Sequence, residues 1–322
     1  MEREVRCDLP GIYAFRQALR KAMWYELWQG WLHKPAELLP FNVVANELHL
    51  HQRVPLGIQQ VPCHAIVGSV DRAGDFTRNF LPRKEYLQAR WFRIHALLNT
   101  HGFDPISLFK VSDIYFVQDG NHRLSVLNWF RTPTVEAEVI EYPCRVPLGV
   151  DLQMADLPCK AAYVEFLEQT DLDWERPEQR IELSQPASYR KLEEHIAGHA
   201  YWLEHCQGEP VSVHRAAVSW YDRVYMPTIA LIRARGLLRD FPGSTEADLY
   251  IELIDYHCQL VREMGRPVSL EVVLEYYRMM AARPKIRRLW YRLRRRNRYH
   301  LSETPGAPLA PVGASSSQFS VR

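Results

Sequence analysis

The stretch that decides the fold is DPISLFKVSDIYFVQDGNHRLSV, residues 104–126. Its apolar residues cluster at 106–111 and 114–118, and the Ser-Asp pair between them is typical of a tight turn. We therefore predict two strands joined as a hairpin. Gly120 then permits a backbone turn that a Cβ would hinder, and the apolar spacing after it is that of a short helix. The stretch predicts a hairpin that leads through a glycine turn directly into a helix.

The segments around this hairpin predict a small mixed α/β domain. Residues 61–70 are apolar and β-branched, which indicates a strand, and residues 83–100 place their apolar side chains on one helical face. Residues 134–142 alternate apolar and polar side chains, as a half-buried strand does. The order strand, helix, hairpin, helix, strand gives a domain over residues 61–142, near the lower end of domain size.

Residues 1–60 are interpreted as an N-terminal helical arm and a linker. The spacing of apolar residues predicts a helix over 10–33, and its segment WYELWQGWL at 24–32 is unusually aromatic. We expect these aromatic side chains to pack against the body of the protein. The stretch 38–60 is expected to be irregular, because prolines punctuate it.

Residues from about 150 onward predict helices only. The predicted helices cover 159–169, 187–205, 212–236, 245–264 and 269–282. Thr245, with Asp248 three residues later, is typical of a helix N-cap. We assign 143–282 to a helical domain and 283–322 to a basic segment followed by a tail that we expect to be disordered. The expected fold class is α+β, a small mixed-sheet domain followed by an all-helical domain.

The first turn of the helix after Gly120 combines several features that bind anions. Free N–H groups and the positive end of the helix dipole face outward there. His122 and Arg123 add two further donors, and a planar guanidinium suits phosphate oxygens. Asp119 can accept from a substrate hydroxyl, orient His122 or act as a general base, so Asp119 and His122 are the candidate catalytic residues. The same pattern also occurs as a purely structural turn, and the residues alone leave that alternative open.

Residues 104–126, together with TVEAEVI at 134–140, resemble the core of the ParB/sulfiredoxin superfamily. The shared pattern is Pro-Ile, a hairpin, a Gly-x-(His/Arg)-Arg turn, a helix and a further strand. The resemblance implies that the turn contacts nucleotide phosphates, so it implies a nucleoside triphosphate as the ligand, with Mg²⁺ bound only through the nucleotide. The residues implied in that contact are Gly120, Asn121, His122 and Arg123.

Two departures from the superfamily matter for function. Asn121 stands where sulfiredoxin has its reactive Cys, so sulfinic-acid reduction by that route is not expected. Asn121 and His122 stand where ParB proteins have Glu-Arg, which leaves the use of CTP open. A longer pattern, GSVDR at 68–72, WYDRVY at 220–225 and FPGSTEADLY at 241–250, resembles an uncharacterised bacterial family that joins such a domain to a helical region. That family brings no established activity.

The loop before the 83–100 helix contains Arg72, Asp75 and Arg78. In the superfamily the corresponding loop approaches the nucleotide site, so the resemblance implies that the loop adds phosphate contacts, by Arg72 and Arg78, or holds a catalytic carboxylate. The alternative is that Arg72 and Asp75 simply pair across the loop and order it.

The charge of the chain is unevenly divided. The formal net charge of the whole chain is +2 at pH 7. Residues 283–298 contain nine Arg or Lys and no Asp or Glu, so the formal net charge of the remaining residues is 2 − 9 = −7. The basic segment also contains Leu, Trp and Tyr, and such a segment can bind nucleic acid or an anionic surface. Its candidate contacts are Arg287, Arg288, Arg292, Arg294, Arg295 and Arg296. The alternatives are that it binds nothing specific or folds onto the acidic remainder.

The composition, 47% hydrophobic and 24% charged, is ordinary for a soluble globular protein. The six cysteines form no C-x-x-C pair, which indicates neither a zinc site nor a dense disulfide framework, so no metal site is expected. The sequence shows no signal-peptide pattern and no apolar stretch long enough for a membrane span. We expect a cytoplasmic protein with reduced thiols.

Two functions follow as expectations. The favoured one is a bacterial nucleotide-binding protein that acts as an NTP-dependent phosphotransferase or hydrolase, or that binds without catalysis. The chain has no Walker Gly-x-x-x-x-Gly-Lys-Ser/Thr loop, so NTP use depends on the Gly120 turn. The rival is a ParB-like DNA-associated regulator or nuclease-like protein whose basic C-terminal segment binds DNA or another polyanion. A scaffold with neither activity is the third possibility.

Overall fold

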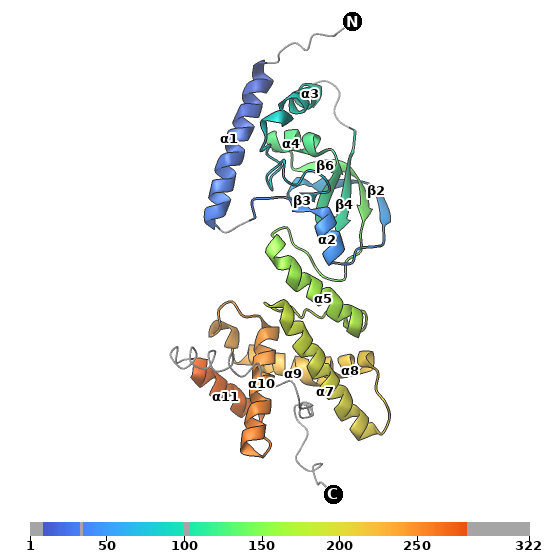
Figure 1. Cartoon of the computed structure of the whole chain (residues 1–322), viewed down its shortest axis with the longest axis vertical. Coiled ribbons are helices and arrows are strands. Elements are labelled where there is room, and N and C mark those ends of the chain that lie inside the picture. Colours follow the sequence, from blue (N-terminus) through green and yellow to red (C-terminus); the bar gives the residue numbers. More distant parts are fainter. Residues whose placement is uncertain (1–8, 33–34, 99–103, 282–322) are drawn as a thin grey trace. The chain divides into compact units, whose positions relative to one another are not determined.

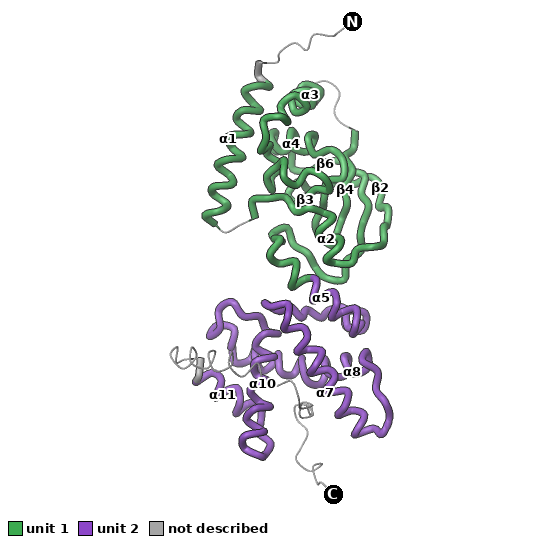
Figure 2. The backbone as a smooth tube through the Cα atoms, viewed as in Figure 1, with its two compact units in different colours: residues 1–160 green, residues 161–322 purple. Residues whose placement is uncertain are grey.

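The computed structural model describes residues 9–32, 35–98 and 104–281 (Figure 1). The chain divides into two compact units, residues 1–160 and residues 161–322 (Figure 2). The described part of the first unit contains a six-stranded mixed sheet with helices, and the second contains helices. The predicted α+β class is therefore confirmed.

The sheet has the strand order β1-β3-β5-β4-β6-β2. Its strands are β1 (Leu39–Pro40), β2 (Val54–Pro62), β3 (Ile66–Ser69), β4 (Ile106–Val111), β5 (Ile114–Asp119) and β6 (Thr134–Glu141). β4 and β5 form the predicted hairpin, in which Val111 pairs with Ile114. β5 runs parallel to β3, and β4 runs parallel to β6. The sheet is mixed, as expected.

Helices cover both faces of the sheet. They are α1 (Leu9–Leu32), α2 (Phe41–Glu47), α3 (Gln88–Leu98) and α4 (Asn121–Trp129). On one face, Leu108 and Val117 join a core that includes Trp91 of α3. On the other face, the ring of Phe41 lies 4.8 Å from that of Phe109, measured between ring centroids. Adjacent residues of β4 thus point to opposite faces and into two separate clusters, as strand geometry requires.

The stretch that we expected to be irregular, 38–60, contains α2 and most of β2. β2 pairs with β6 along its length, yet most of its side chains are exposed on both faces. An edge strand that buries neither face shows no alternation of apolar and polar residues, and that is why its sequence gives no strand signal. The predicted strand over 61–70 is also interrupted, by a 3-10 turn at Cys63–Ala65.

The aromatic segment of α1 does not pack as expected. α1 contacts the body of the unit mainly through its first half, where the ring of Phe15 lies edge-on to Trp91 at 5.7 Å. The side chains of Trp24, Trp28 and Trp31 are 73%, 61% and 72% exposed. The expectation that these rings pack against the protein is therefore wrong, because they occupy the outer side of the helix.

The second unit is built from helices that match most of the predicted ranges. They are α5 (Leu157–Thr170), which begins in the first unit, α6 (Leu172–Glu175), α7 (Tyr189–Gln207), α8 (Val213–Trp220), α9 (Met226–Ala234), α10 (Glu246–Met264) and α11 (Leu270–Ala281). A π-helical turn at Tyr221–Tyr225 joins α8 to α9 within the single helix that we predicted. Thr245 and Asp248 form the predicted cap as a reciprocal capping box.

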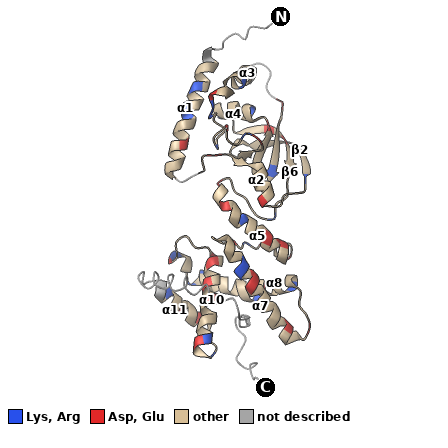
Figure 3. Ribbon diagram, in the orientation of Figure 1, with Lys and Arg blue, Asp and Glu red and all other residues tan. Residues whose placement is uncertain are grey.

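Acidic and basic side chains are interspersed over the described helices of both units (Figure 3). Among the residues described, no helix is long and apolar enough to cross a membrane. The basic segment 283–298 and its six candidate arginines lie outside the described residues.

Candidate functional site

The candidate site lies where two parallel strands end side by side. β3 ends at Ser69 and β5 ends at Asp119, so the loop after one strand and the turn after the other share an edge of the sheet. The backbone N–H of Val70 donates to the carbonyl of Val117 over 3.0 Å and fixes the start of the loop. Crevices at the carboxyl ends of adjacent parallel strands are the usual place for ligands in open α/β sheets.

Gly120 makes the turn that the sequence predicts. Its φ is +104°, a left-handed conformation that residues with a Cβ rarely adopt. A Cβ added at Gly120 would lie 2.5 Å from Cγ2 and 2.8 Å from Cβ of Ile106. Both the backbone angle and the space therefore require glycine, and the chain passes from β5 into α4 without an intervening loop.

The first turn of α4 leaves three amides open. The backbone N–H of Leu124 donates to the carbonyl of Gly120 over 2.9 Å, which is the first helical hydrogen bond. Within the described part of the chain, the N–H groups of Asn121, His122 and Arg123 donate to no protein group. Such orphan amides, at the positive end of a helix dipole, can bind an anion.

Arg123 is engaged by the protein itself. Its Nη1 donates to the carbonyls of Asp104, at 2.8 Å, and Pro105, at 3.2 Å. Its Nη2 donates to Oδ2 of Asp119 over 2.6 Å. The guanidinium that we expected to bind phosphate therefore clamps the segment before β4 and the end of β5 to the turn. Asp119 shares its carboxylate with Arg123, and its side chain is 66% exposed.

Asn121 and His122 point inward, and each is only 8% exposed. The imidazole of His122 lies edge-on to Phe76 at 5.4 Å. Burial is the largest cause that lowers the pKa of His122, the positive charges of Arg90 and Arg72 add to it, and the charge of Asp75 opposes it, so that the pKa is about 4. The ring is therefore neutral at pH 7. Among the described residues, neither Nδ1 of His122 nor Oδ1 of Asn121 has a hydrogen-bond partner.

Arg72 and Arg90 supply positive charge beside His122. Arg72 is half exposed and pairs with Asp75 over 3.1 Å, while the hydroxyl of Tyr86 donates to the other oxygen of the same carboxylate. The pairing of Arg72 with Asp75 that we considered as an alternative is thus present. Arg90 is exposed on α3 and forms no ion pair within the described ranges. Arg90 has no functional signal in the sequence, because a basic residue inside an amphipathic helix is ordinary.

Arg78 is not part of this group. It is buried, and its Nη2 donates to the carbonyls of Val150 and Leu152 over 2.8 and 2.9 Å. A weaker bond joins its Nη1 to the carbonyl of Glu37. Burial lowers the pKa of Arg78 to about 10, so it remains charged at pH 7. The structure places Arg72 beside the Gly120 turn and separates Arg78 from it.

The described residues include no group of three or more His, Cys, Asp or Glu side chains that could hold a metal ion. No protein-family model matches the chain, and no curated protein is similar to it.

Proposed function

We propose that the first unit binds a phosphate-bearing ligand, specifically a nucleotide, where β3 and β5 end. The observation that carries this proposal is the set of three unpartnered amides at the start of α4, in a turn that requires Gly120. An anion there gains hydrogen bonds that the protein leaves unmade, and it meets the positive end of the helix dipole. Arg72 and Arg90 add positive charge on the same side, as their effect on the pKa of His122 indicates.

The proposal gives each residue of the turn a separate task. The amides of residues 121–123 cradle the phosphate, and Arg72 and Arg90 neutralise its charge. Arg123 holds the turn in shape through its bonds to the carbonyls of residues 104–105. His122 contributes as a neutral ring rather than as a cation.

The resemblance of this stretch to the ParB/sulfiredoxin superfamily favours a nucleotide over inorganic phosphate, because the corresponding turn in those proteins contacts nucleotide phosphates. Mg²⁺ then enters with the nucleotide. If the bound nucleotide reacts, Asp119 is the exposed carboxylate at the turn and the candidate general base. The proposed reaction is phosphoryl transfer to a hydroxyl or to water, as in an NTP-dependent phosphotransferase or hydrolase.

A ligand screen tests the proposal. Calorimetry and thermal shift would be carried out with CTP, ATP, ADP and GTP, each with Mg²⁺. A ligand present at about 100 times its Kd should stabilise the folded chain by about 2.7 kcal/mol. Release of inorganic phosphate, compared between the wild type and Asp119→Asn, tests the reaction separately.

The double variant Arg72→Gln/Arg90→Gln should weaken nucleotide binding by at least about tenfold, because each lost charge-assisted bond contributes about 1.5–3 kcal/mol. The control is Arg93→Gln, which removes another exposed arginine of α3 that does not affect His122. Binding of no nucleotide, or equal binding by the double variant and the wild type, would contradict the proposal.

A further inference from the structure

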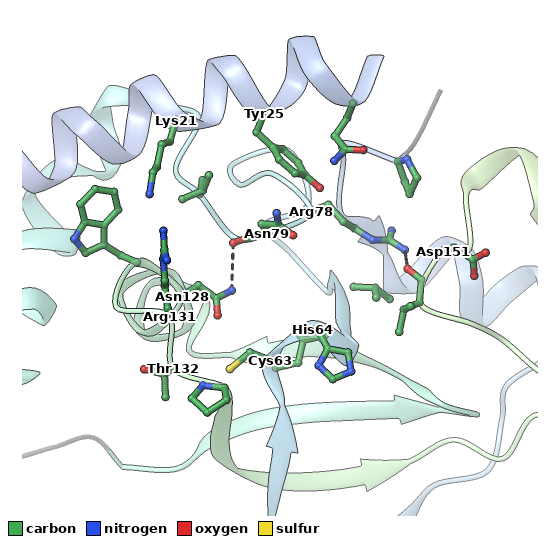
Figure 4. A pocket seen from close by; sticks show the side chains of 18 of the residues that line it. Lys21, Tyr25, Cys63, His64, Arg78, Asn79, Asn128, Arg131, Thr132 and Asp151 are labelled. Atoms are coloured by element: carbon green, nitrogen blue, oxygen red, sulfur yellow. Dashed lines mark hydrogen bonds between the residues drawn. The ribbon is translucent and has the colours of Figure 1, made fainter. Parts of the chain in front are cut away.

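The first unit also contains a cleft at the opposite end of α4. Its volume is about 1080 Å³, and it is lined by residues from α1, from the start of β3, from the loop around Arg78 and from the C-terminal end of α4 (Figure 4). Arg78 is the only residue predicted for the phosphate site that lines this cleft. The sequence does not predict the cleft, because its walls come from segments far apart in the chain.

Two cations enter the same end of the cleft. Figure 4 shows the ammonium of Lys21, from α1, and the guanidinium of Arg131, just after α4, pointing into this end from opposite walls. The Lys21 ammonium lies over the ring of Trp129, 4.9 Å from its centroid. Neither Lys21 nor Arg131 pairs with a carboxylate of the described chain. Two like charges that share a cleft repel each other, and an anion placed between them removes that cost.

The other end of the cleft is polar and more nearly neutral in charge. There the hydroxyl of Tyr25 points toward Arg78, and Asp151 lies beyond it (Figure 4). Within the described residues, Nε of Arg78 and Oε1 of Gln29 are buried without a hydrogen-bond partner. A buried charged group with an unmet donor is costly, so a ligand that accepts a hydrogen bond at this end would be favoured.

The walls between the two ends combine apolar side chains with the polar side chains of Asn79 and Asn128 (Figure 4). Ile66, Val67 and Leu81 line the cleft together with the Trp129 ring. The volume is slightly above the usual range for small-molecule sites, about 300–1000 Å³, in which apolar walls and a few polar groups are typical. An inorganic ion would leave the apolar part of the lining in contact with water, so this part of the cleft favours a ligand with a carbon body.

We propose that this cleft binds a small organic anion, whose acidic group lies between Lys21 and Arg131 and whose body extends toward Tyr25 and Arg78. The site is separate from the Gly120 turn, because the turn lies at the N-terminal end of α4 and the cleft at its C-terminal end, where Asn128 and Trp129 line it. It does not depend on the nucleotide proposal. Either site can be lost while the other remains.

The test uses the full chain and the fluorescent organic anion 8-anilinonaphthalene-1-sulfonate as the probe. The double variant Lys21→Gln/Arg131→Gln should raise the Kd of the dye at least about tenfold. The matched control, Arg20→Gln, changes an exposed cation next to Lys21 that does not line the cleft, and it should leave the Kd unchanged. The variant Arg72→Gln/Arg90→Gln should also leave the dye affinity unchanged, which separates this site from the turn.

Two further measurements keep the test decisive. Displacement of the dye by phenyl phosphate or by hexanoate distinguishes a phosphate monoester from a carboxylate as the preferred acidic group. N-phenyl-1-naphthylamine, an uncharged counterpart of the dye, should bind the wild type and the double variant equally, and this control shows that the double variant is folded. The proposal is wrong if the double variant binds the anionic dye as tightly as the wild type, or if neither competitor displaces it.

Discussion

The two ends of α4 present positive charge in different ways. At its N-terminal end three open backbone amides follow Gly120 in one contiguous run of sequence, and Arg72 and Arg90 add positive charge beside them. At its C-terminal end the charge belongs to side chains, Lys21 and Arg131, which tertiary packing brings into one cleft. The first kind of site can be recognised from a short motif. The second depends on how distant segments meet, so it emerges only from the fold.

The largest expected effect concerns the backbone end. Gly120→Ala should destabilise the first unit by about 3–5 kcal/mol, because it combines a left-handed backbone with overpacking against Ile106. Thermal unfolding measures the change. Gly74→Ala is the control, because no atom lies within 4 Å of the added Cβ and the backbone there is not left-handed. Equal melting temperatures for the two variants would mean that the turn is not constrained as described.

The next prediction concerns the side-chain end. Arg78→Met should destabilise the unit by about 2–4 kcal/mol, since it removes two short charge-assisted bonds from a buried guanidinium to backbone carbonyls. Arg72→Met, in the same loop, should cost less than about 1 kcal/mol, because its ion pair with Asp75 is partly exposed. Chemical denaturation of the two variants compares them. A larger loss for Arg72→Met would reverse the roles assigned to the two arginines.

The smallest expected effect is a pH dependence at the backbone end. The folded state holds the pKa of His122 at about 4, below its ordinary value of 6.5, so the unfolded chain binds the proton more readily. The free energy of unfolding is therefore unaffected by His122 above pH 6.5 and decreases as the pH falls toward 4. Between pH 7 and pH 5 the decrease is about 2 kcal/mol.

The variant His122→Gln should remove that part of the pH dependence, whereas His51→Gln, at an exposed position, should retain it. Melting temperatures at the two pH values provide the measurement. If His122→Gln and the wild type lose equal stability, His122 is not held neutral, and the charge at this end of α4 does not come from the amides and arginines alone.

The sequence predicts the parts of the fold in which one side of an element is buried. Val135, Ala137 and Val139 of β6 are buried and alternate with exposed residues, and the β4–β5 hairpin and its glycine turn lie as predicted. It does not predict β2, because an edge strand exposed on both faces has no periodic pattern. It also misplaces the tryptophans of α1, because an aromatic segment indicates burial whether or not a surface is present to cover it.

The candidate site likewise has parts that the sequence predicts and parts that it does not. Gly120 and the residues after it were found from their order in the chain. The role of Arg123 cannot be predicted from the sequence, because its partners are the backbone carbonyls of residues 104 and 105. Every residue has such a carbonyl, so the sequence does not show which ones an arginine will contact. Arg78 was assigned to the phosphate site by its place in the loop. Only the path of the backbone reveals that it faces the carbonyls of Val150 and Leu152 instead.

The central claim is that an anion is held by the amides that open α4. Its most direct test is a titration of the ¹⁵N-labelled chain with ATP and Mg²⁺, followed by amide resonances. The amides of Asn121, His122 and Arg123 should shift the most and should saturate together with one Kd. If ATP binds while these three resonances stay in place, the phosphate lies elsewhere and the claim is contradicted.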